Sequence, residues 1–304
     1  MGVSLVGALL ALVIEGAAAA AGLDPANLAA WSTQLGISPD SLAGDLRTHV
    51  GEDTTEGDVF YHVGRLAYER RKYQFAAHMF QRASSLLPDS ANVWDELGLA
   101  YYLTKDYRAA ERALRRALAL SPRKPEYYNH LGLVYLQIER YTEAVANFLA
   151  ALGIEPAYVE ARYNLGHSYE VQNRDDVAQR EFRRAIRDSP AFVPARYALA
   201  LVLRRAERYD EALAHLDTAI ATDPGYLNAY VERGFIALRR RQYSAAEGDF
   251  RHVLEADARH ARARYGLGLT FAFERQWVAA QNQCDTLAAI DSLLATRLQR
   301  VIAK

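Results

Sequence analysis

The sequence predicts an all-α solenoid in which pairs of helices stack one behind another, and three observations lead to this prediction. A period of 34 residues runs from Gly57 to about Ser292 without insertion or deletion. Within each period apolar residues recur at three- and four-residue spacing, which is typical of helices with one buried face. Small residues also recur at fixed places, where closely packed helices need them. Because one helix pair cannot bury its apolar stripe alone, neighbouring pairs are expected to stack into a continuous core.

Two columns of small residues mark every period. The first column contains Gly64, Gly98, Gly132, Gly166, Ala200, Gly234 and Gly268. Twelve residues later an alanine follows each time, at Ala76, Ala110, Ala144, Ala178, Ala212, Ala246 and Ala280. A larger side chain in the first column is expected to overpack the helix crossing, at a cost of about 1 to 3 kcal/mol.

Two helices are predicted in each period. In the second period Trp94, Leu97 and Tyr101 share one face of the first helix, and Ala110 and Leu114 share one face of the second. An aromatic residue lies between the two columns in every period but one, at Tyr73, Tyr107, Tyr141, Tyr209, Tyr243 and Trp277. A proline ends the second helix in the first five periods, at Pro88, Pro122, Pro156, Pro190 and Pro224.

These columns strongly resemble the tetratricopeptide repeat family. The resemblance covers residues 57–292 and implies a right-handed superhelical solenoid of antiparallel helix pairs. It divides this segment into seven repeats, at 57–90, 91–124, 125–158, 159–192, 193–226, 227–260 and 261–292.

The first 22 residues resemble a secretory signal peptide. Val3 to Ile14 is an apolar run, and Glu15 separates it from Gly16 and a tract of alanines of the kind that signal peptidase cleaves. The run is too short to span a bilayer unless Glu15 is buried within it, so we expect no integral membrane span. An uncleaved anchor and an intracellular start remain the alternatives.

Helices outside the 34-residue register are expected to cap the two ends of the solenoid, because solenoids need such caps for solubility. Residues 23–56 contain two helix starts with proline at the first helical position, Asp24-Pro25 and Ser38-Pro39. Residues 293–304 form the second cap, where Leu294, Leu298 and Val301 share one stripe.

Composition and motifs argue against several classes of function. The formal net charge is −1, which gives no bulk attraction to nucleic acid or to anionic membrane. The single cysteine, Cys284, occupies a core column and excludes an internal disulfide. No catalytic motif, cofactor motif or phosphate loop is present, so we expect neither an enzyme nor a cofactor. His130 and His167 lie on adjacent first helices, but without a third ligand they predict no metal site.

The tetratricopeptide resemblance implies that a ligand lies in a concave groove lined by the first helices. Side chains three before, one after and four after the small-residue column point into this groove. The groove residues expected to bind a protein or peptide are Tyr61, Arg65, Tyr68, Asp95, Tyr102, Asn129, Tyr163, His167, Glu170, Tyr197, Arg204, Phe235 and Tyr265. Tyrosine suits peptide recognition because it offers a large contact area and a polar tip. The alternative is that some of these tyrosines only pack against the neighbouring repeat.

Charge along the expected groove suggests a direction for the ligand. Acidic residues lie toward the first half, at Asp58, Asp95, Glu126, Glu160 and Glu170, and basic residues lie toward the second half, at Arg204, Arg205, Arg239 and Arg262. Such a groove would orient a bound segment with its basic part over repeats one to four. Scatter of charges on a solvated helix face is the competing interpretation.

The sequence therefore predicts a non-enzymatic protein-interaction scaffold. The signal-like start suggests a periplasmic or secreted protein that acts in bacterial envelope assembly or secretion. The alternatives are a cytoplasmic regulatory module, an accessory subunit of an enzyme complex, and self-association through exposed groove surface.

Overall fold

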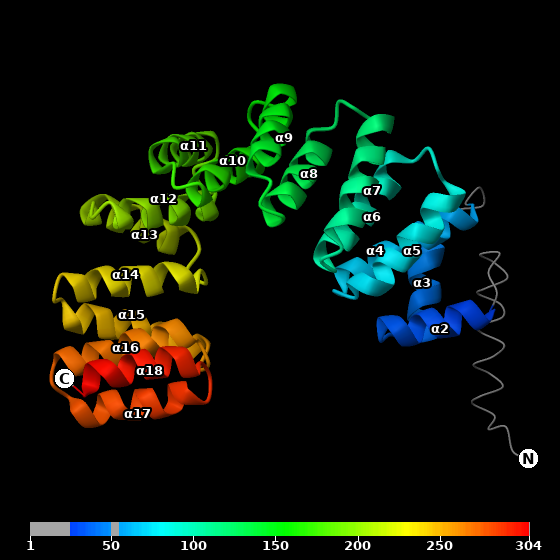
Figure 1. Ribbon diagram of the computed structural model, residues 1–304. Coiled ribbons are helices and arrows are strands. Elements are labelled where there is room, and N and C mark those ends of the chain that lie inside the picture. Colours follow the sequence, from blue (N-terminus) through cyan, green and yellow to red (C-terminus); the bar gives the residue numbers. More distant parts are fainter. Residues whose placement is uncertain (1–24, 50–54, 304) are drawn as a thin grey trace, which may run out of the picture. The chain divides into compact units, whose positions relative to one another are not determined.

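The computed structural model describes residues 25–49 and 55–303, and this part of the chain forms 17 helices and no strand (Figure 1). The helices follow one another in antiparallel pairs, so the protein is an all-α tetratricopeptide solenoid with additional helices at both ends. Residues 1–22, where the signal peptide is expected, lie outside the described residues. The chain divides within helix α10 into two compact units, residues 1–164 and 165–304.

The first unit contains the N-terminal helices and the first repeats. Two short helices come first, α2 (Pro25–Leu35) and α3 (Pro39–His49). The helix pairs that follow are α4 (Glu56–Glu69) with α5 (Tyr73–Leu86), α6 (Ala91–Leu103) with α7 (Tyr107–Leu120), and α8 (Pro125–Gln137) with α9 (Tyr141–Ile154). Both prolines expected at helix starts occupy the first helical position, and the Ser38 hydroxyl accepts the backbone N–H of Ser41 as an N-cap.

The second unit repeats the pattern. Helix α10 (Val159–Val171) precedes α11 (Asp175–Asp188), and the next pairs are α12 (Val193–Arg205) with α13 (Tyr209–Thr222), α14 (Leu227–Arg239) with α15 (Tyr243–Ala256), and α16 (Ala261–Phe273) with α17 (Trp277–Ala288). The final helix, α18 (Ser292–Ile302), packs against α16 and α17.

The small-residue column receives a large side chain from the second helix of the same repeat. A Cβ added to Gly132 would lie 2.6 Å from Cε1 of Phe148, and one added to Gly234 would lie 2.8 Å from Cε1 of Phe250. Both rings are fully buried. The glycines are therefore needed because an aromatic or leucine side chain fills the space above them, and the nearest atoms belong to that side chain rather than to another backbone.

The last repeat differs because its second helix carries Cys284 where other repeats carry phenylalanine or leucine. Here Leu298 of α18 takes the missing place, since its Cδ2 would lie 2.4 Å from a Cβ added to Gly268. Cys284 is buried, and its Sγ–H lies 3.3 Å from the carbonyl oxygen of Ala295. Helix α18 thus completes the core of the seventh pair.

The turn inside each repeat contains one residue in the left-handed backbone region. These residues are Arg71, Lys105, Glu139, Asn173, Glu207, Arg241 and Arg275, all with φ between 57° and 65°. The N–H of the next residue then bonds back to the first helix, as when Arg140 donates to the carbonyl of Tyr135 at 2.8 Å. This pattern ends one helix and reverses the chain within a few residues.

Candidate protein-interaction site

Consecutive first helices are joined by polar side-chain pairs whose members lie 35 residues apart. The Asp95 carboxylate lies 2.8 Å from Nδ1 of His130, and Asn164 donates to Asn129 at 2.9 Å. Tyr127 donates to Asn92 at 2.6 Å. Because the repeat is 34 residues long, each pair connects a position in one repeat with the next position in the following repeat.

Two of the predicted groove residues are therefore committed to contacts between repeats. Asp95 and Asn129 are both buried, and each uses its polar group on the first helix of the next repeat. A buried polar group without a partner would cost free energy, so these bonds hold neighbouring repeats in register. Tyr163, at the end of the first unit, is half-buried and has partners of its own.

The predicted tyrosines of the first unit pack partly against their own repeat. The ring of Tyr61 lies 5.8 Å from that of Phe80, Tyr68 lies 5.5 Å from Tyr73, and all the rings are tilted or edge-on to their neighbours. Tyr102 makes the same contact with Tyr107 at 6.0 Å. Burial raises the pKa of the Tyr61, Tyr68 and Tyr102 hydroxyls above the usual value. Each ring is half-buried, so part of its surface is left for a ligand.

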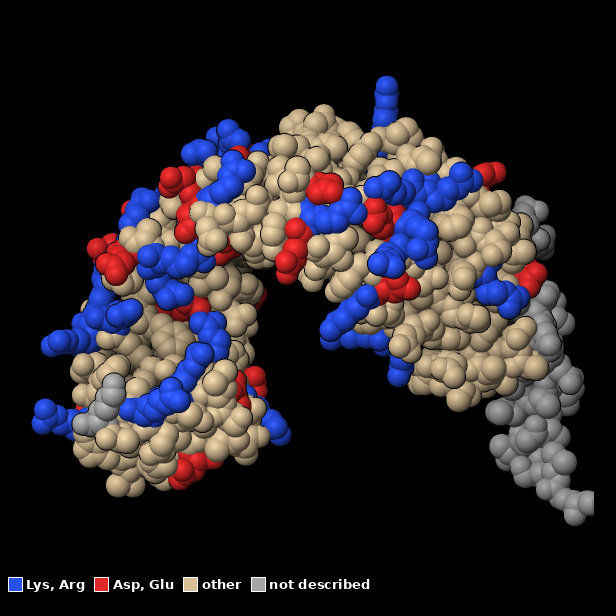
Figure 2. All heavy atoms as spheres, in the orientation of Figure 1, with Lys and Arg blue, Asp and Glu red and all other residues tan. Residues whose placement is uncertain are grey.

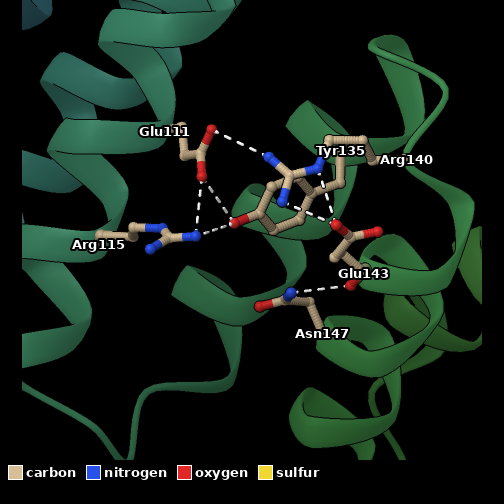
Figure 3. Close-up of polar contacts among 6 residues, drawn as sticks. All are labelled: Glu111, Arg115, Tyr135, Arg140, Glu143 and Asn147. Carbon is tan, nitrogen blue, oxygen red and sulfur yellow. Dashed lines mark hydrogen bonds and ion pairs between the residues drawn. The ribbon is translucent and has the colours of Figure 1, made fainter.

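A polar network joins α7 of the second repeat to the third repeat (Figure 3). The Tyr135 hydroxyl accepts a hydrogen bond from Arg115 at 2.8 Å and donates to Glu111 at 3.0 Å. The guanidinium of Arg140 stacks 4.5 Å from the Tyr135 ring centre and bonds to Glu143 at 2.8 Å. Burial, and after it the contacts with Arg115 and Glu111, leave the pKa of Tyr135 raised. All these groups are satisfied within the protein, which makes the network a structural joint.

Predicted site residues of the second unit also form pairs. Glu170 accepts from Arg205 at 2.7 Å and lies 3.2 Å from Nδ1 of His167. Burial alone would raise the pKa of Glu170, but the hydrogen bonds from His167 and Arg205 outweigh it and lower the pKa. Tyr197 packs edge-on against Tyr226 at 5.4 Å. Tyr265 is half-buried against the cluster beneath α18.

A buried carboxylate that was not among the predicted site residues connects three repeats of this unit. Glu232 of α14 accepts a hydrogen bond from Arg262 of α16 at 2.5 Å and forms an ion pair with Arg204 of α12 at 3.0 Å. The contact with Arg204 lacks hydrogen-bond geometry, so it is electrostatic. Burial, followed by the charge of Glu232, raises the pKa of the neighbouring Tyr197 to about 12.

A pocket of about 380 Å³ opens beside Arg204 on the same three first helices, and we call it the α12–α14–α16 pocket. Its residues are Arg204, Arg205, Glu207, Tyr209, Phe235, Leu238, Arg239, Leu269 and Phe273. Phe235 rests on Phe250 at 5.2 Å and is thereby fixed in the wall. Of the predicted groove residues, Arg204 and Phe235 meet in this pocket, while Arg239 joins it from the end of α14.

Positive charge in the pocket is unevenly neutralised. Arg205 forms an ion pair with Glu170 and a second one with Asp175 at 3.0 Å. Arg204 forms an ion pair with Glu232. Within the described part of the chain, exposed Arg239 has neither a hydrogen-bond partner nor an ion-pair partner. Figure 2 shows acidic side chains beside several basic ones, in keeping with such pairing. Arg239 is therefore the pocket arginine whose charge no acid of the described residues neutralises.

No metal centre or membrane helix was found in residues 25–49 and 55–303. His130 and His167 each bind a carboxylate of their own unit, and no group of three or more His, Cys, Asp or Glu side chains in these residues is arranged to hold an ion. Among the same residues, no helix combines the length and apolar character needed to cross a bilayer.

Comparisons with known proteins agree with this architecture. The model of the cilia and flagella-associated protein 70 C-terminal domain matches residues 45–232, and a tetratricopeptide repeat model matches residues 232–280. A comparison with the sequences of curated proteins found no match.

Several solved structures have the same fold as this chain. The Cut9–Hcn1 structure of the APC/C hetero-tetramer aligns with a TM-score of 0.68 and 13% identity, over 86% of this chain and 51% of that one. PilF of Pseudomonas aeruginosa aligns with a TM-score of 0.59 and 18% identity, over 68% and 95% of the two chains. The pilus biogenesis factor PilW gives 0.59 and 20%, over 67% and 94%. At these identities the likeness establishes the fold alone.

The repeats, the inter-repeat pairs and the pocket define a tetratricopeptide protein-interaction scaffold. Because the first family model covers more than half of the sequence, the chain belongs to the family of the cilia and flagella-associated protein 70 C-terminal domain.

Proposed function

We propose that this protein is a non-enzymatic regulatory or accessory subunit that recruits a partner protein through its first helices, with the α12–α14–α16 pocket as the main contact. The observation that carries the proposal is this pocket, where apolar side chains and an unpaired arginine meet on three successive repeats. Pockets with an apolar wall and a few placed polar groups are typical of binding sites.

The family favours the regulatory alternative over a role in envelope assembly. Its name refers to cilia and flagella, which supports placing this protein in an intracellular complex. The expectation of export depends on residues 1–22, which lie outside the described residues. Mass spectrometry of the N-terminus of the protein from its native host separates the two: an intact start supports the intracellular proposal, and cleavage after the alanine tract contradicts it.

The predicted groove residues contribute to the proposal in different degrees. Arg204 and Phe235 line the pocket, and half-buried Tyr61, Tyr68 and Tyr102 offer further contact surface in the first unit. We propose that Asp95, Asn129 and Glu170 act on binding only indirectly, by holding the first helices in register. The exposed Arg65, which faces Glu69 at 3.9 Å, remains available to a ligand.

Affinity capture tests the proposed function. The full chain is compared with an Arg239→Glu/Phe273→Ala variant, in which both changed side chains are exposed and so should leave the fold intact. The matched control is Arg297→Glu/Leu293→Ala, which makes the same kinds of change on exposed positions of α18. A partner that is lost from the first variant and kept by the control supports the proposal. Partners that bind all three proteins equally contradict it.

A further inference from the structure

We infer that the α12–α14–α16 pocket is specific for an acidic peptide segment in which an apolar side chain stands next to carboxylates. This inference rests on the proposed function and adds the chemistry of the partner.

The apolar residues that line the pocket favour a ligand with an apolar side chain. Phe235, buried Leu238, Leu269 and Phe273 line the pocket, and half of the Phe273 surface is exposed to water. A volume of about 380 Å³ accommodates one leucine or phenylalanine side chain together with its neighbours along a peptide. Covering Phe273 removes apolar surface from water, which is the main source of affinity in such contacts.

The arginines that line the pocket favour a ligand with carboxylates. Arg204, Arg205 and Arg239 line it, and Glu207 is the single acidic lining residue. A guanidinium has five N–H donors in a fixed plane, so an arginine that already binds one carboxylate keeps donors for a second. Arg204 and Arg205 are about 40% exposed. Glu232 orients Arg204 and Glu170 orients Arg205, while Arg239 forms no ion pair with any acidic residue of the described part of the chain. Arginine binds carboxylates through two parallel hydrogen bonds, which favours aspartate, glutamate or a chain end over neutral groups.

The shape of the surface favours a peptide over an anionic membrane. Two of the three arginines line a pocket and are each held by an ion pair, Arg204 with Glu232 and Arg205 with Glu170. A lipid surface would instead require basic side chains free to spread over a flat face. Binding to anionic vesicles is accordingly the outcome that would replace this inference by another.

Three fluorescein-labelled peptides test the specificity with the full-length protein. The first contains Glu-Glu-Leu-Phe-Glu-Glu, the second replaces every Glu by Lys, and the third keeps Glu but replaces Leu-Phe by Ser-Ser. Fluorescence anisotropy at physiological salt is expected to show binding of the first peptide at least tenfold tighter than of either other peptide. Arg239→Glu should weaken it tenfold or more and improve binding of the lysine peptide, whereas Arg297→Glu should change neither.

Several outcomes overturn the inference. These are a failure of the acidic apolar peptide to bind, equal binding of the acidic and basic peptides, or an unchanged affinity in Arg239→Glu. Binding to vesicles containing phosphatidylserine that the acidic peptide does not compete would assign the surface to lipid. If affinity capture shows a pocket-dependent partner but the peptides show no preference for acid, the proposed function stands and this inference alone fails. If affinity capture also gives the same partners with and without the pocket substitutions, the proposed function and this inference both fail.

Discussion

The Glu232 carboxylate of α14 accepts a hydrogen bond from Arg262 of α16 at 2.5 Å, although only 1% of Glu232 is exposed. Arg204 of α12 approaches the same carboxylate at 3.0 Å from the other side. One buried charge thus links three repeats and orients an arginine of the pocket. A buried carboxylate is stable only when it is paired in this way.

Replacing Glu232 by glutamine is expected to destabilise the protein by about 1 to 3 kcal/mol, because Arg204 and Arg262 lose the charge between them. Urea unfolding followed by circular dichroism measures the effect. The matched control is Asp210→Asn, which removes a carboxylate that bonds to Arg240 at 2.6 Å but is 90% exposed. That exposed pair should contribute about 0.5 kcal/mol or less. Equal losses in the two variants would contradict a special role for Glu232.

The small-residue column makes a packing prediction that can be tested within one repeat. Gly132→Ala should cost about 1 to 3 kcal/mol, because the new methyl group would lie 2.6 Å from the buried Phe148 ring. Adding Phe148→Leu should recover part of this loss, since Ala200 already stands opposite Leu216 in the fifth repeat, both of them buried.

The control for this packing test is Gly153→Ala in α9, where a Cβ would meet nothing within 4 Å. This change should be neutral or stabilise by up to about 1 kcal/mol, because alanine favours the helix over glycine. Chemical denaturation of the wild-type protein and the three variants gives the comparison. A Gly132→Ala protein as stable as Gly153→Ala would show that the ring moves freely aside.

Left-handed turn residues offer an opposite prediction, a stabilising substitution. Glu139 has φ of 60°, is exposed and has no side-chain partner within the described residues. Glu139→Gly should stabilise the protein by about 1 kcal/mol, because glycine adopts this backbone region without steric cost. Glu139→Ala keeps the Cβ and should leave the unfolding midpoint nearly unchanged. A midpoint that rises equally in both variants would point to removal of the charge as the cause.

The periodicity was sufficient to predict the helix pairs, but only part of the candidate site. The seven small-residue positions and the residues that end the helices are local features, so they can be recognised in the sequence alone. Asp95 and Asn129 were expected in an open groove because positions were compared at a spacing of 34 residues. Their partners, His130 and Asn164, lie 35 residues away. A search for polar pairs at that spacing would have found these joints.

The pocket could be predicted only in part, because Arg205, Arg239 and Phe273 lie five residues after the small-residue column, a position that was not assigned to the groove. Arg239 was nevertheless expected among the basic residues of the groove, and Leu269 stands one residue after the small-residue column, whereas Leu238 and Phe273 were not among the predicted groove residues. The column of Glu232 also contains His62, Glu96, His130, Asn164, Ala198 and Gly266, so its residue type changes from repeat to repeat and does not by itself indicate a buried carboxylate. Which of several arginines keeps an unpaired charge depends on distances between repeats, and those distances exist only in the folded protein.

Stability should decrease toward acidic pH through His215 of α13. Burial, followed by the charges of Arg196 and Arg183, lowers the pKa of His215 below its ordinary value of 6.5. The unfolded chain therefore binds this proton more readily than the folded protein does. The imidazole is neutral in both states at pH 8, and the folded state loses stability as pH falls below about 6.5.

His215→Gln removes the titrating group, so the wild-type protein should lose more free energy of unfolding than the variant between pH 8 and pH 5. Urea unfolding at several pH values measures this difference. His78→Gln, on exposed surface of α5, serves as the control for the loss of a histidine. A His215→Gln profile parallel to the wild-type profile would mean that the histidine titrates alike in both states.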